Sequence, residues 1–343
     1  MPSSIHPFLE TALTEFLARR VDQQVAWSPL VARLLSAHED GHAFIEIVDD
    51  LQDKALRSIN LSPEDVSEPL VYYEQKLYFR RFFNAERGIA ARLISRAEMM
   101  ESLAPTHLKD EHSTLPDSLS DEQRDAILAC VDCPHTLITG GPGTGKTTLI
   151  RSAVSLIQAT HENVRILLAA PTGKAAARLR ETLQSEANGE SEALTAQTLH
   201  QLLDLRRGQA GSKYDEQHPL PADYLFIDEA SMIDLLMMSR LFAACGPDTR
   251  VALLGDPDQL TSVDAGSVLA DLCGEASASG PLAECRVRLN VSRRAGKSTG
   301  ILELAERVNT GQPQAALDWI QDSAHPHLRH EPLPVTDALA GQL

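Results

Sequence analysis

A glycine-rich run at residues 140–147 carries the clearest chemical signal in this chain. Its sequence, GGPGTGKT, has the G-x-x-x-x-G-K-[ST] spacing of a loop that binds nucleotide phosphates. In such a loop backbone N–H groups approach the phosphates, the lysine reaches the β- and γ-oxygens, and the last hydroxyl is a ligand of Mg²⁺. The expected nucleotide-binding residues are Gly140, Gly141, Pro142, Gly143, Thr144, Gly145, Lys146, Thr147 and Thr148, with Lys146 also catalytic and Thr147 a magnesium ligand.

Two adjacent acids follow an apolar stretch that begins at residue 224. The sequence there is YLFIDEAS, and it ends a probable strand in Asp228 and Glu229. Asp228 is expected to hold Mg²⁺, and Glu229 to orient or deprotonate the water that attacks the γ-phosphate. Paired acids after a strand also form simple solvated turns. The phosphate loop upstream favours the catalytic interpretation.

A third strand is expected over residues 250–254, and it leads into the sequence GDPDQL. Gln259 would place a neutral amide beside the γ-phosphate and report whether that phosphate is present. The alternative is a Gly-Asp-Pro-Asp turn with an incidental glutamine, because such dipeptides commonly punctuate loops.

Five motifs in this order resemble those of superfamily 1 helicases, and within them the RecD group. They are GGPGTGKT, then APTGKAAARL from residue 170, TLH from 198, IDEAS from 227 and GDPDQL from 255. The PTGKAA element looks like motif Ia of the alpha (RecD) subunits of exodeoxyribonuclease V. This resemblance implies an ATP-dependent 5′-to-3′ DNA helicase subunit that acts in double-strand break repair by homologous recombination. It also implies ATP and Mg²⁺ as cofactors, DNA ends as substrate, and RecB-like and RecC-like partners in a heterotrimer.

The same resemblance assigns further residues. Gln123 would read adenine, and Arg294 would contact phosphate, with the adjacent Arg293 as the alternative for that role. Single-stranded DNA would contact Thr172, Lys174, Thr198 and His200. Lys174 and Arg178 are four residues apart and could equally form a solvated helix face. His200 alone would more often be a core or capping histidine.

The spacing of apolar segments predicts an α/β fold. Expected strands near residues 136, 165, 225, 251 and 287 alternate with expected helices after 146, 174, 234 and 301. This is the RecA-like P-loop architecture, a parallel sheet with helices on both faces. The predicted division is a helical, partner-contacting domain at 1–110, a linker at 111–120, the motor domain at 121–310, and at 311–343 a linker or the start of a second motor domain. Apolar residues from Tyr72 to Ile94 have the spacing of one core helix.

Composition limits the other possibilities. The net charge of −17 opposes a broad basic surface, so any DNA contact must be local or supplied by partners. Five cysteines favour reduced thiols, and the lone C-x-x-C at residues 130–133 lacks the further ligands that zinc needs. With no apolar run of ~18 residues and no signal-like N-terminus, we expect a cytoplasmic protein.

Superfamily 1 motors split ATP between two RecA-like domains, and too few residues follow Arg294 for a second domain of ~100 residues. We therefore expect a truncated chain that hydrolyses ATP poorly alone. Two other functions remain open: a RecD-like or Pif1-like helicase that acts without partners, and a nucleotide-gated structural subunit of a nuclease complex. Co-purification with a nuclease subunit would separate the first from the leading interpretation.

Overall fold

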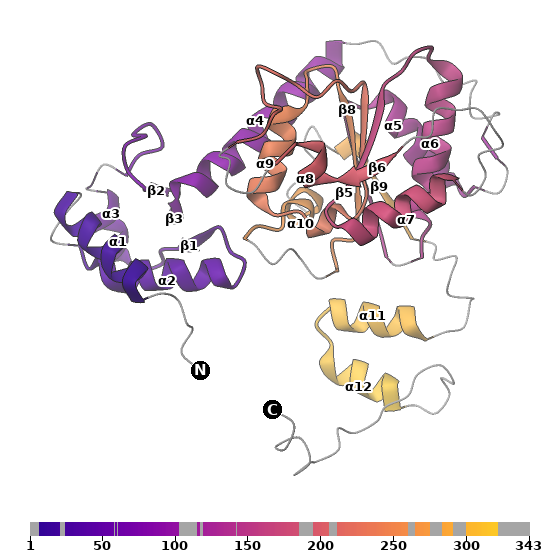
Figure 1. Ribbon diagram of the computed structural model, residues 1–343. Helices are drawn as coiled ribbons and strands as arrows, with labels where there is room; N and C mark the ends of the chain where they lie inside the picture. The colour runs from indigo at the N-terminus through magenta and orange to yellow at the C-terminus, as the bar shows by residue number, and fades with distance from the viewer. Residues whose placement is uncertain are drawn as a thin grey trace, which may run out of the picture. The chain divides into compact units, whose positions relative to one another are not determined.

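A six-stranded parallel sheet lies at the centre of the larger part of the molecule (Figure 1). All of its neighbouring strands are parallel. The strands are β4 (His135–Gly140), β5 (Ile166–Ala170), β6 (Ala196–Thr198), β7 (Tyr224–Ile227), β8 (Arg250–Gly255) and β9 (Arg286–Leu289), in the spatial order β6-β5-β7-β8-β4-β9. The five predicted strands are confirmed. The sequence does not predict β6, because its three residues contain no apolar run.

This computed structural model describes residues 7–20, 25–57, 59, 61–102, 115–116, 119–141, 143–184, 195–205, 211–259, 265–274, 283–290 and 300–321. The chain divides into two units. One consists of residues 1–140 and 146–289, and the other of residues 141–145 and 290–343. Within the described ranges, every helix is too short or too polar to cross a lipid bilayer.

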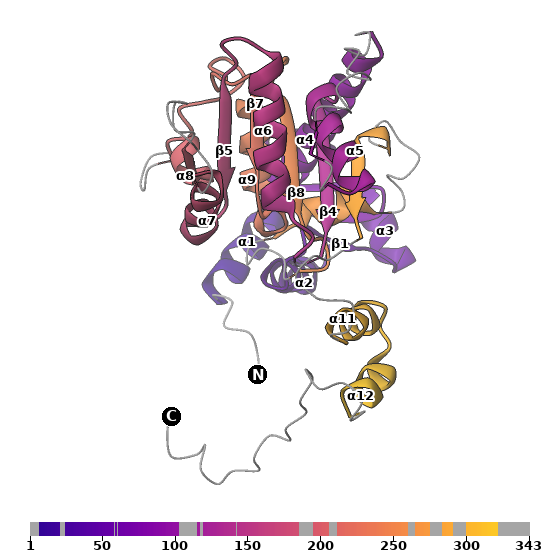
Figure 2. The ribbon, with the colours of Figure 1, turned by 90° about the vertical axis from the view of Figure 1, so that its right-hand side faces the viewer.

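Helices cover both faces of the sheet, as the sequence predicts. Figure 2 shows α6 in front of the sheet and α9 behind it. Consecutive strand residues alternate between the two cores: Leu253 packs with the α9 side and Leu254 with the α6 side. The helices around the sheet are α5 (Asp121–Asp132), α6 (Lys146–Thr160), α7 (Gly173–Gln184), α8 (Leu199–Leu202), α9 (Leu235–Ala244) and α10 (Val268–Cys273), with short 3₁₀ turns η2 (Ala230–Met232) and η4 (Ala283–Cys285).

The N-terminal part contains a small antiparallel sheet as well as helices. Its strands have the spatial order β1-β3-β2, and they share a core with the first helices. The elements are α1 (Pro7–Arg20), α2 (Trp27–Glu39), β1 (Phe44–Glu46), α3 (Asp50–Arg57), β2 (Leu70–Tyr73), β3 (Lys76–Phe79) and α4 (Arg80–Ser102).

The expectation of one helix from Tyr72 to Ile94 is wrong in its first part. Residues 70–79 form a β-hairpin, and the helix starts only at Arg80. Glu74 and Gln75 have φ values of 48° and 60°, the left-handed pair that a tight hairpin turn requires. Aromatic and β-branched residues suit strands as well as buried helices, so the apolar spacing alone did not separate the two.

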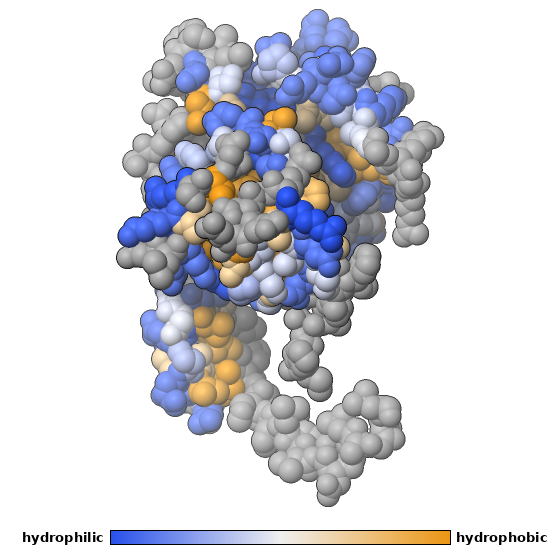
Figure 3. Space-filling view, turned by 90° about the vertical axis from the view of Figure 1, so that its left-hand side faces the viewer, coloured by the Kyte–Doolittle hydropathy of each residue, from blue (hydrophilic) through white to orange (hydrophobic). Residues whose placement is uncertain are grey.

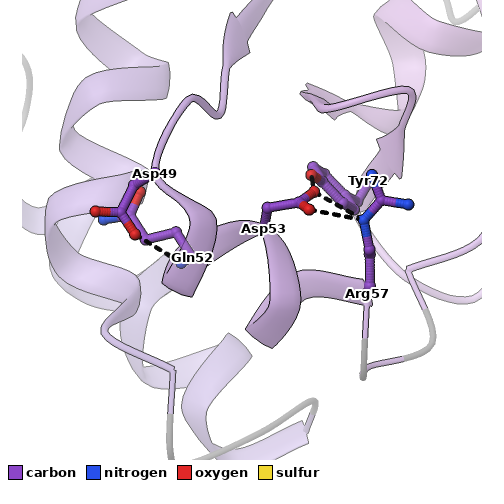
Figure 4. A network of polar contacts seen from close by, with 5 residues as sticks. All are labelled: Asp49, Gln52, Asp53, Arg57 and Tyr72. Carbon is purple, nitrogen blue, oxygen red and sulfur yellow. Dashed lines mark hydrogen bonds and ion pairs between the residues drawn. The ribbon is translucent and has the colours of Figure 1, made fainter.

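A polar network ties α3 to β2 (Figure 4). The Asp49 carboxylate accepts a hydrogen bond from the Gln52 backbone N–H at 2.9 Å, at the start of the helix. Asp53 accepts from Arg57 Nε at 2.8 Å and also from the Tyr72 hydroxyl. Burial, together with the Asp53 carboxylate, raises the pKa of Tyr72 to about 12. The tyrosine therefore remains a neutral donor to that carboxylate.

Helix α4 joins the N-terminal part to the sheet domain. Its apolar residues belong to the same core as α9 and the strands of the large sheet. The buried Arg96 guanidinium donates to the carbonyl oxygen of Thr249 at 2.5 Å and also to that of Gly246. A second link is the hydrogen bond from Gly266 N–H to the Gly41 carbonyl oxygen, 2.9 Å long. The last helix of the predicted N-terminal domain thus packs as part of the sheet domain.

The smaller unit contains two helices, α11 (Ile301–Asn309) and α12 (Pro313–Gln321). Trp319 Nε1 donates to the Gly300 carbonyl oxygen at 2.9 Å, and the Arg307 guanidinium lies 3.9 Å from the centre of the Trp319 ring. These contacts hold the two helices together. Val308 and Leu317 are exposed, and apolar surface is visible on these helices in Figure 3.

Candidate nucleotide-binding site

The phosphate-binding loop has the predicted connection. It follows β4, which ends at Gly140, and it precedes α6, which begins at Lys146. Gly143 and Gly145 have φ values of 79° and 89°, which L-residues with a side chain rarely adopt. Within the loop the Thr144 hydroxyl donates to the Gly141 carbonyl oxygen at 2.9 Å. Pro142 lies outside the described residues.

Lys146 is 9% exposed at the first position of α6. Its ammonium group donates to the Gly140 carbonyl oxygen, so the side chain folds back over its own loop. Burial lowers the pKa of Lys146, and three acids, Asp256, Glu229 and Asp228, act in the opposite direction. The lysine thus lies in a strongly acidic setting, where a phosphate could take the place of the carbonyl group.

The two predicted magnesium ligands lie in contact. The Thr147 hydroxyl donates to Asp228 Oδ2 at 3.0 Å, although the two residues come from α6 and the end of β7. Asp228 is 4% exposed, and burial raises its pKa while the Thr147 hydrogen bond lowers it. A hydroxyl and a carboxylate oxygen at hydrogen-bond distance are the hard oxygen donors that Mg²⁺ prefers, so these residues fit the ion.

Glu229 has a strained backbone conformation and a carboxyl group with a raised pKa. Its φ of 55° is in the left-handed region, which costs a residue with a side chain of order 1–3 kcal/mol. Burial first, and then the neighbouring Asp228, raise the pKa of Glu229. Its Oε2 atom is buried without a hydrogen-bond partner, and so is the hydroxyl of Ser231. A half-buried carboxylate on a strained backbone, with one buried oxygen open to a donor, suits a general base.

The turn after β8 presents Gln259. The Gln259 N–H donates to the Asp256 carbonyl oxygen at 3.1 Å, and the Asp258 N–H donates to Asp256 Oδ1 at 3.2 Å. Gln259 is half-buried and Asp256 only 4% exposed. The sequence interpretation assigns no role to Asp256. Its position directly after a strand, like that of Asp228, is the signal that could have identified it.

Gln123 has a structural role in addition to the predicted one. With Ser120 it forms a capping box at the start of α5: the Gln123 N–H donates to the Ser120 hydroxyl, and the Ser120 N–H to Gln123 Oε1, both at 3.3 Å. The side chain is 5% exposed. Adenine reading stays a prediction, because the cap alone explains the burial.

The predicted DNA-contacting residues lie on two neighbouring strand ends. Thr172 follows β5 and caps α7 through the Ala175 N–H, at 3.2 Å. Thr198 ends β6, which pairs with β5, and forms a capping box with Gln201. The structure thus brings both threonines to the carboxyl edge of the sheet.

Lys174 and His200 follow these threonines and are exposed. The alternative of a core histidine is therefore wrong for His200. Arg178 is exposed one turn after Lys174, as a solvated helix face also requires. The predicted Arg294 and its alternative Arg293 lie outside the described residues.

The chain is similar in sequence to a known domain family and to several helicases. Residues 123–265 match the family described as "AAA domain". The RecD subunit of the RecBCD enzyme of Mycolicibacterium smegmatis is 37% identical over 281 residues, which cover 75% of this chain and 49% of the relative. The ATP-dependent RecD2 DNA helicase of Deinococcus radiodurans is 40% identical over 154 residues, 45% of this chain and 20% of the relative. The crystal structure of Bacteroides Pif1 helicase with ADP-AlF3 and single-stranded DNA has a TM-score of 0.40 at 21% identity, covering 60% of this chain and 50% of that one. The chain spans about half the length of the RecD subunits that it matches first.

Proposed function

Because the chain belongs with the RecD subunits among the superfamily 1 helicases, we propose that it carries the ATP-hydrolysing site of a DNA helicase subunit of exodeoxyribonuclease V. The observation that carries this proposal is the contact between the Thr147 hydroxyl and Asp228, beside Lys146 and Glu229. A hydroxyl, two acids and a lysine converge there from separate segments, which is what nucleotide triphosphate hydrolysis requires.

Each group has a role in hydrolysis. Lys146 exchanges the Gly140 carbonyl oxygen for phosphate oxygens, and Thr147 and Asp228 are the residues that would hold Mg²⁺. The bound ion would neutralise phosphate charge and orient the γ-phosphate. Glu229 Oε2 accepts a proton from water as the water oxygen bonds to the γ-phosphorus. The bond to the β–γ bridging oxygen breaks, and ADP leaves with the electron pair. Gln259 contacts the γ-phosphate region, and the resemblance to RecD assigns a further phosphate contact to Arg294 or its neighbour Arg293.

Single-stranded DNA would run along the ends of β5 and β6. Thr172 and Thr198 lie at these strand ends, and the exposed Lys174 and His200 each lie two residues further along the chain. These groups form a narrow row of DNA contacts. A narrow row of contacts is compatible with the net charge of −17, because it does not require a wide basic surface. The 5′-to-3′ direction follows from resemblance to RecD alone.

The proposed assembly is a heterotrimer with RecB-like and RecC-like subunits that acts on DNA ends in double-strand break repair. The relatives named as RecD subunits of the RecBCD enzyme support it, because they align with most of this chain. Partner subunits would also supply the electrostatic capture of DNA that so acidic a chain lacks.

The test is ATP hydrolysis by the full-length polypeptide with and without single-stranded DNA, beside a Lys146→Gln variant. We expect turnover that DNA stimulates and that the variant abolishes. Nucleotide binding that needs Lys146 but leads to no turnover, in the polypeptide or in its complex, would instead support a nucleotide-gated structural subunit.

A second candidate is a RecD-like helicase that acts without those partners. The 40% identity to the RecD2 helicase over 154 residues motivates it, although that match covers 45% of this chain and the match to the RecD subunit covers 75%. Affinity purification of the tagged full-length protein from its own cells separates the two. Stable recovery of a nuclease subunit supports the exonuclease V assignment, and recovery of an active helicase alone supports the second candidate.

A further inference from the structure

We propose that Leu269, on helix α10, is the positioning residue that keeps Glu229 in its strained backbone conformation. This assignment rests on the proposed function and deepens it, because it concerns how the proposed general base of the same site is held. Leu269 acts through the backbone of η2, the short turn that follows Glu229 directly.

The backbone around Glu229 is held from both sides. A residue with a side chain stays in the left-handed region only where its surroundings fix the chain before and after it. Before it, the Asp228 N–H donates to the Ala169 carbonyl oxygen on β5, and the Glu229 N–H donates to Asp228 Oδ1, both at 3.0 Å. After it, the Glu229 carbonyl oxygen accepts the Met232 N–H at 3.1 Å, which closes η2. The φ rotation of Glu229 therefore lies between a segment held by the sheet and the η2 turn.

The η2 turn packs against the end of β8 and against α10. Gly255, the last residue of β8, shows how close this packing is. A Cβ there would lie 3.0 Å from the Ser231 backbone nitrogen, 3.4 Å from that of Ala230 and 2.4 Å from Leu269 Cδ2. Leu269 is 1% exposed and fills the space that a side chain at position 255 would need. The leucine methyl group and the backbone of η2 thus lie next to each other at the strand end.

Helix α10 is fixed at both ends. Just before its first turn, the Gly266 N–H donates to the Gly41 carbonyl oxygen at 2.9 Å. At its other end, the Arg286 guanidinium donates to the carbonyl oxygens of Cys273 and Gly274, the latter at 3.4 Å. The helix is therefore held in place, and its buried leucine keeps its position beside η2.

The expected consequence of losing this leucine follows from the packing. Truncating the side chain leaves a cavity beside η2, into which the turn can relax. Glu229 can then return to a negative φ, which carries its carboxylate away from the attacking water. Because the phosphate loop and Lys146 bind the nucleotide, turnover should fall while the affinity for ATP is kept.

The test is steady-state ATP hydrolysis by the full-length polypeptide with single-stranded DNA, together with the affinity for a fluorescent ATP analogue and the denaturation midpoint. We expect Leu269→Ala to lower kcat roughly 10- to 100-fold and to change the affinity by less than about twofold. Leu93→Ala is the matched control, since this leucine on α4 is 4% exposed and belongs to the same core. It should lower the denaturation midpoint comparably and keep kcat within about twofold.

Two further variants test whether the effect passes through Glu229. Leu269→Met conserves the side-chain volume and should restore kcat to within about threefold of the unaltered protein. In a Glu229→Gln background, Leu269→Ala should change the single-turnover rate by less than about twofold, because the base that it positions is already lost. An equal loss in both backgrounds would overturn the proposal, and so would a parallel loss of kcat and ATP affinity. If Leu269→Ala does not fold, Leu269→Val and Leu93→Val repeat the comparison.

The two proposals fail in different ways. If the unaltered full-length polypeptide hydrolyses no ATP, the proposed function itself is wrong. If it hydrolyses ATP and Leu269→Ala is as active as Leu93→Ala, only the role of Leu269 is wrong.

Discussion

The two ends of the large sheet differ in whether their charged side chains have hydrogen-bond partners. At the amino end Arg96 is buried, and its guanidinium donates to two loop carbonyl oxygens. At the carboxyl end Glu229 is strained, and its Oε2 has no hydrogen-bond partner. A buried charge with its hydrogen bonds made stabilises the fold, whereas one with an open acceptor is available to a ligand. The difference predicts which substitutions change activity and which change stability.

The largest effect is expected at the carboxyl end. Glu229→Gln should lower ATP turnover by about 10²- to 10⁴-fold, the usual contribution of a general base. Its free energy of unfolding should not fall, because the variant removes the charge from a half-buried side chain whose Oε2 has no hydrogen-bond partner. Steady-state hydrolysis and chemical denaturation measure the two quantities, with the exposed Glu181→Gln on α7 as the control. Unchanged turnover would mean that Glu229 is not the base.

At the amino end the expectation is reversed. Arg96→Met removes the guanidinium donor from the carbonyl oxygens of Thr249 and Gly246, of which the second keeps the Thr249 N–H at 3.2 Å, and this should lower the free energy of unfolding by about 2 to 3 kcal/mol. Nucleotide affinity in the folded protein should be unchanged. Arg165→Met, which removes an exposed arginine paired with Asp223, is the matched control and should hardly alter the denaturation midpoint. If Arg96→Met lost nucleotide affinity without losing stability, the assignment of a purely stabilising role to the amino end would be wrong.

The pH dependence of the free energy of unfolding tests the role of His135 at the amino end of the sheet. It is 1% exposed, neither ring nitrogen has a hydrogen-bond partner, and burial lowers its pKa from 6.5 to about 4. The unfolded chain therefore binds the proton first, and the stability contribution is present above pH 6.5 and lost as pH falls toward 4. Between pH 7.5 and 5 this loss is about 2 kcal/mol. Denaturation at both pH values should show a smaller decrease in His135→Leu than in the unaltered protein. A control, His42→Leu at an exposed histidine, should keep the full decrease.

The smallest effect is expected at Gln123, where a cap and a predicted base contact coincide. Gln123→Glu can still close the capping box, so its free energy of unfolding should change by less than about 0.5 kcal/mol. A carboxylate cannot donate to adenine, and the affinity for ATP should fall roughly tenfold. Gln123→Ala should lose both the affinity and about 1 kcal/mol of stability. Equal ATP affinity in all three proteins would restrict Gln123 to the helix cap.

Much of the site could be predicted because its chemistry depends on short segments. The glycine spacing, the strand before it and the lysine after it are adjacent in the chain, and so are Asp228 and Glu229. The helix-capping roles of Thr172 and Thr198 could also have been expected, since a threonine before a helix commonly caps it. Asp256 was missed because a single acid in a Gly-Asp-Pro-Asp turn looks like ordinary loop chemistry until the strand order is known.

The N-terminal part was predicted less well for a related reason. The residues from Tyr72 to Phe79 are apolar enough for a buried helix or a strand, and the hairpin turn at Glu74 and Gln75 lacks the glycine or asparagine that usually marks it. The docking of α4 on the sheet domain could not be predicted either. Arg96 reads as a surface residue in the sequence, and only its contacts with Gly246 and Thr249 show that it is buried.

By itself the sequence determined that this protein has a glycine-rich loop with the spacing of a phosphate-binding loop, an acid pair suited to magnesium-assisted hydrolysis and an alternation of strands and helices. These features follow from local spacing, because side-chain periodicity and backbone freedom act over a few residues. Only the tertiary structure decided that Thr147 contacts Asp228, that β8, which leads into Asp256, lies between β4 and β7, and that Glu229 keeps an unpaired oxygen. Burial and hydrogen bonding between strands distant in the chain depend on the order in which those strands assemble, and no local pattern encodes that order.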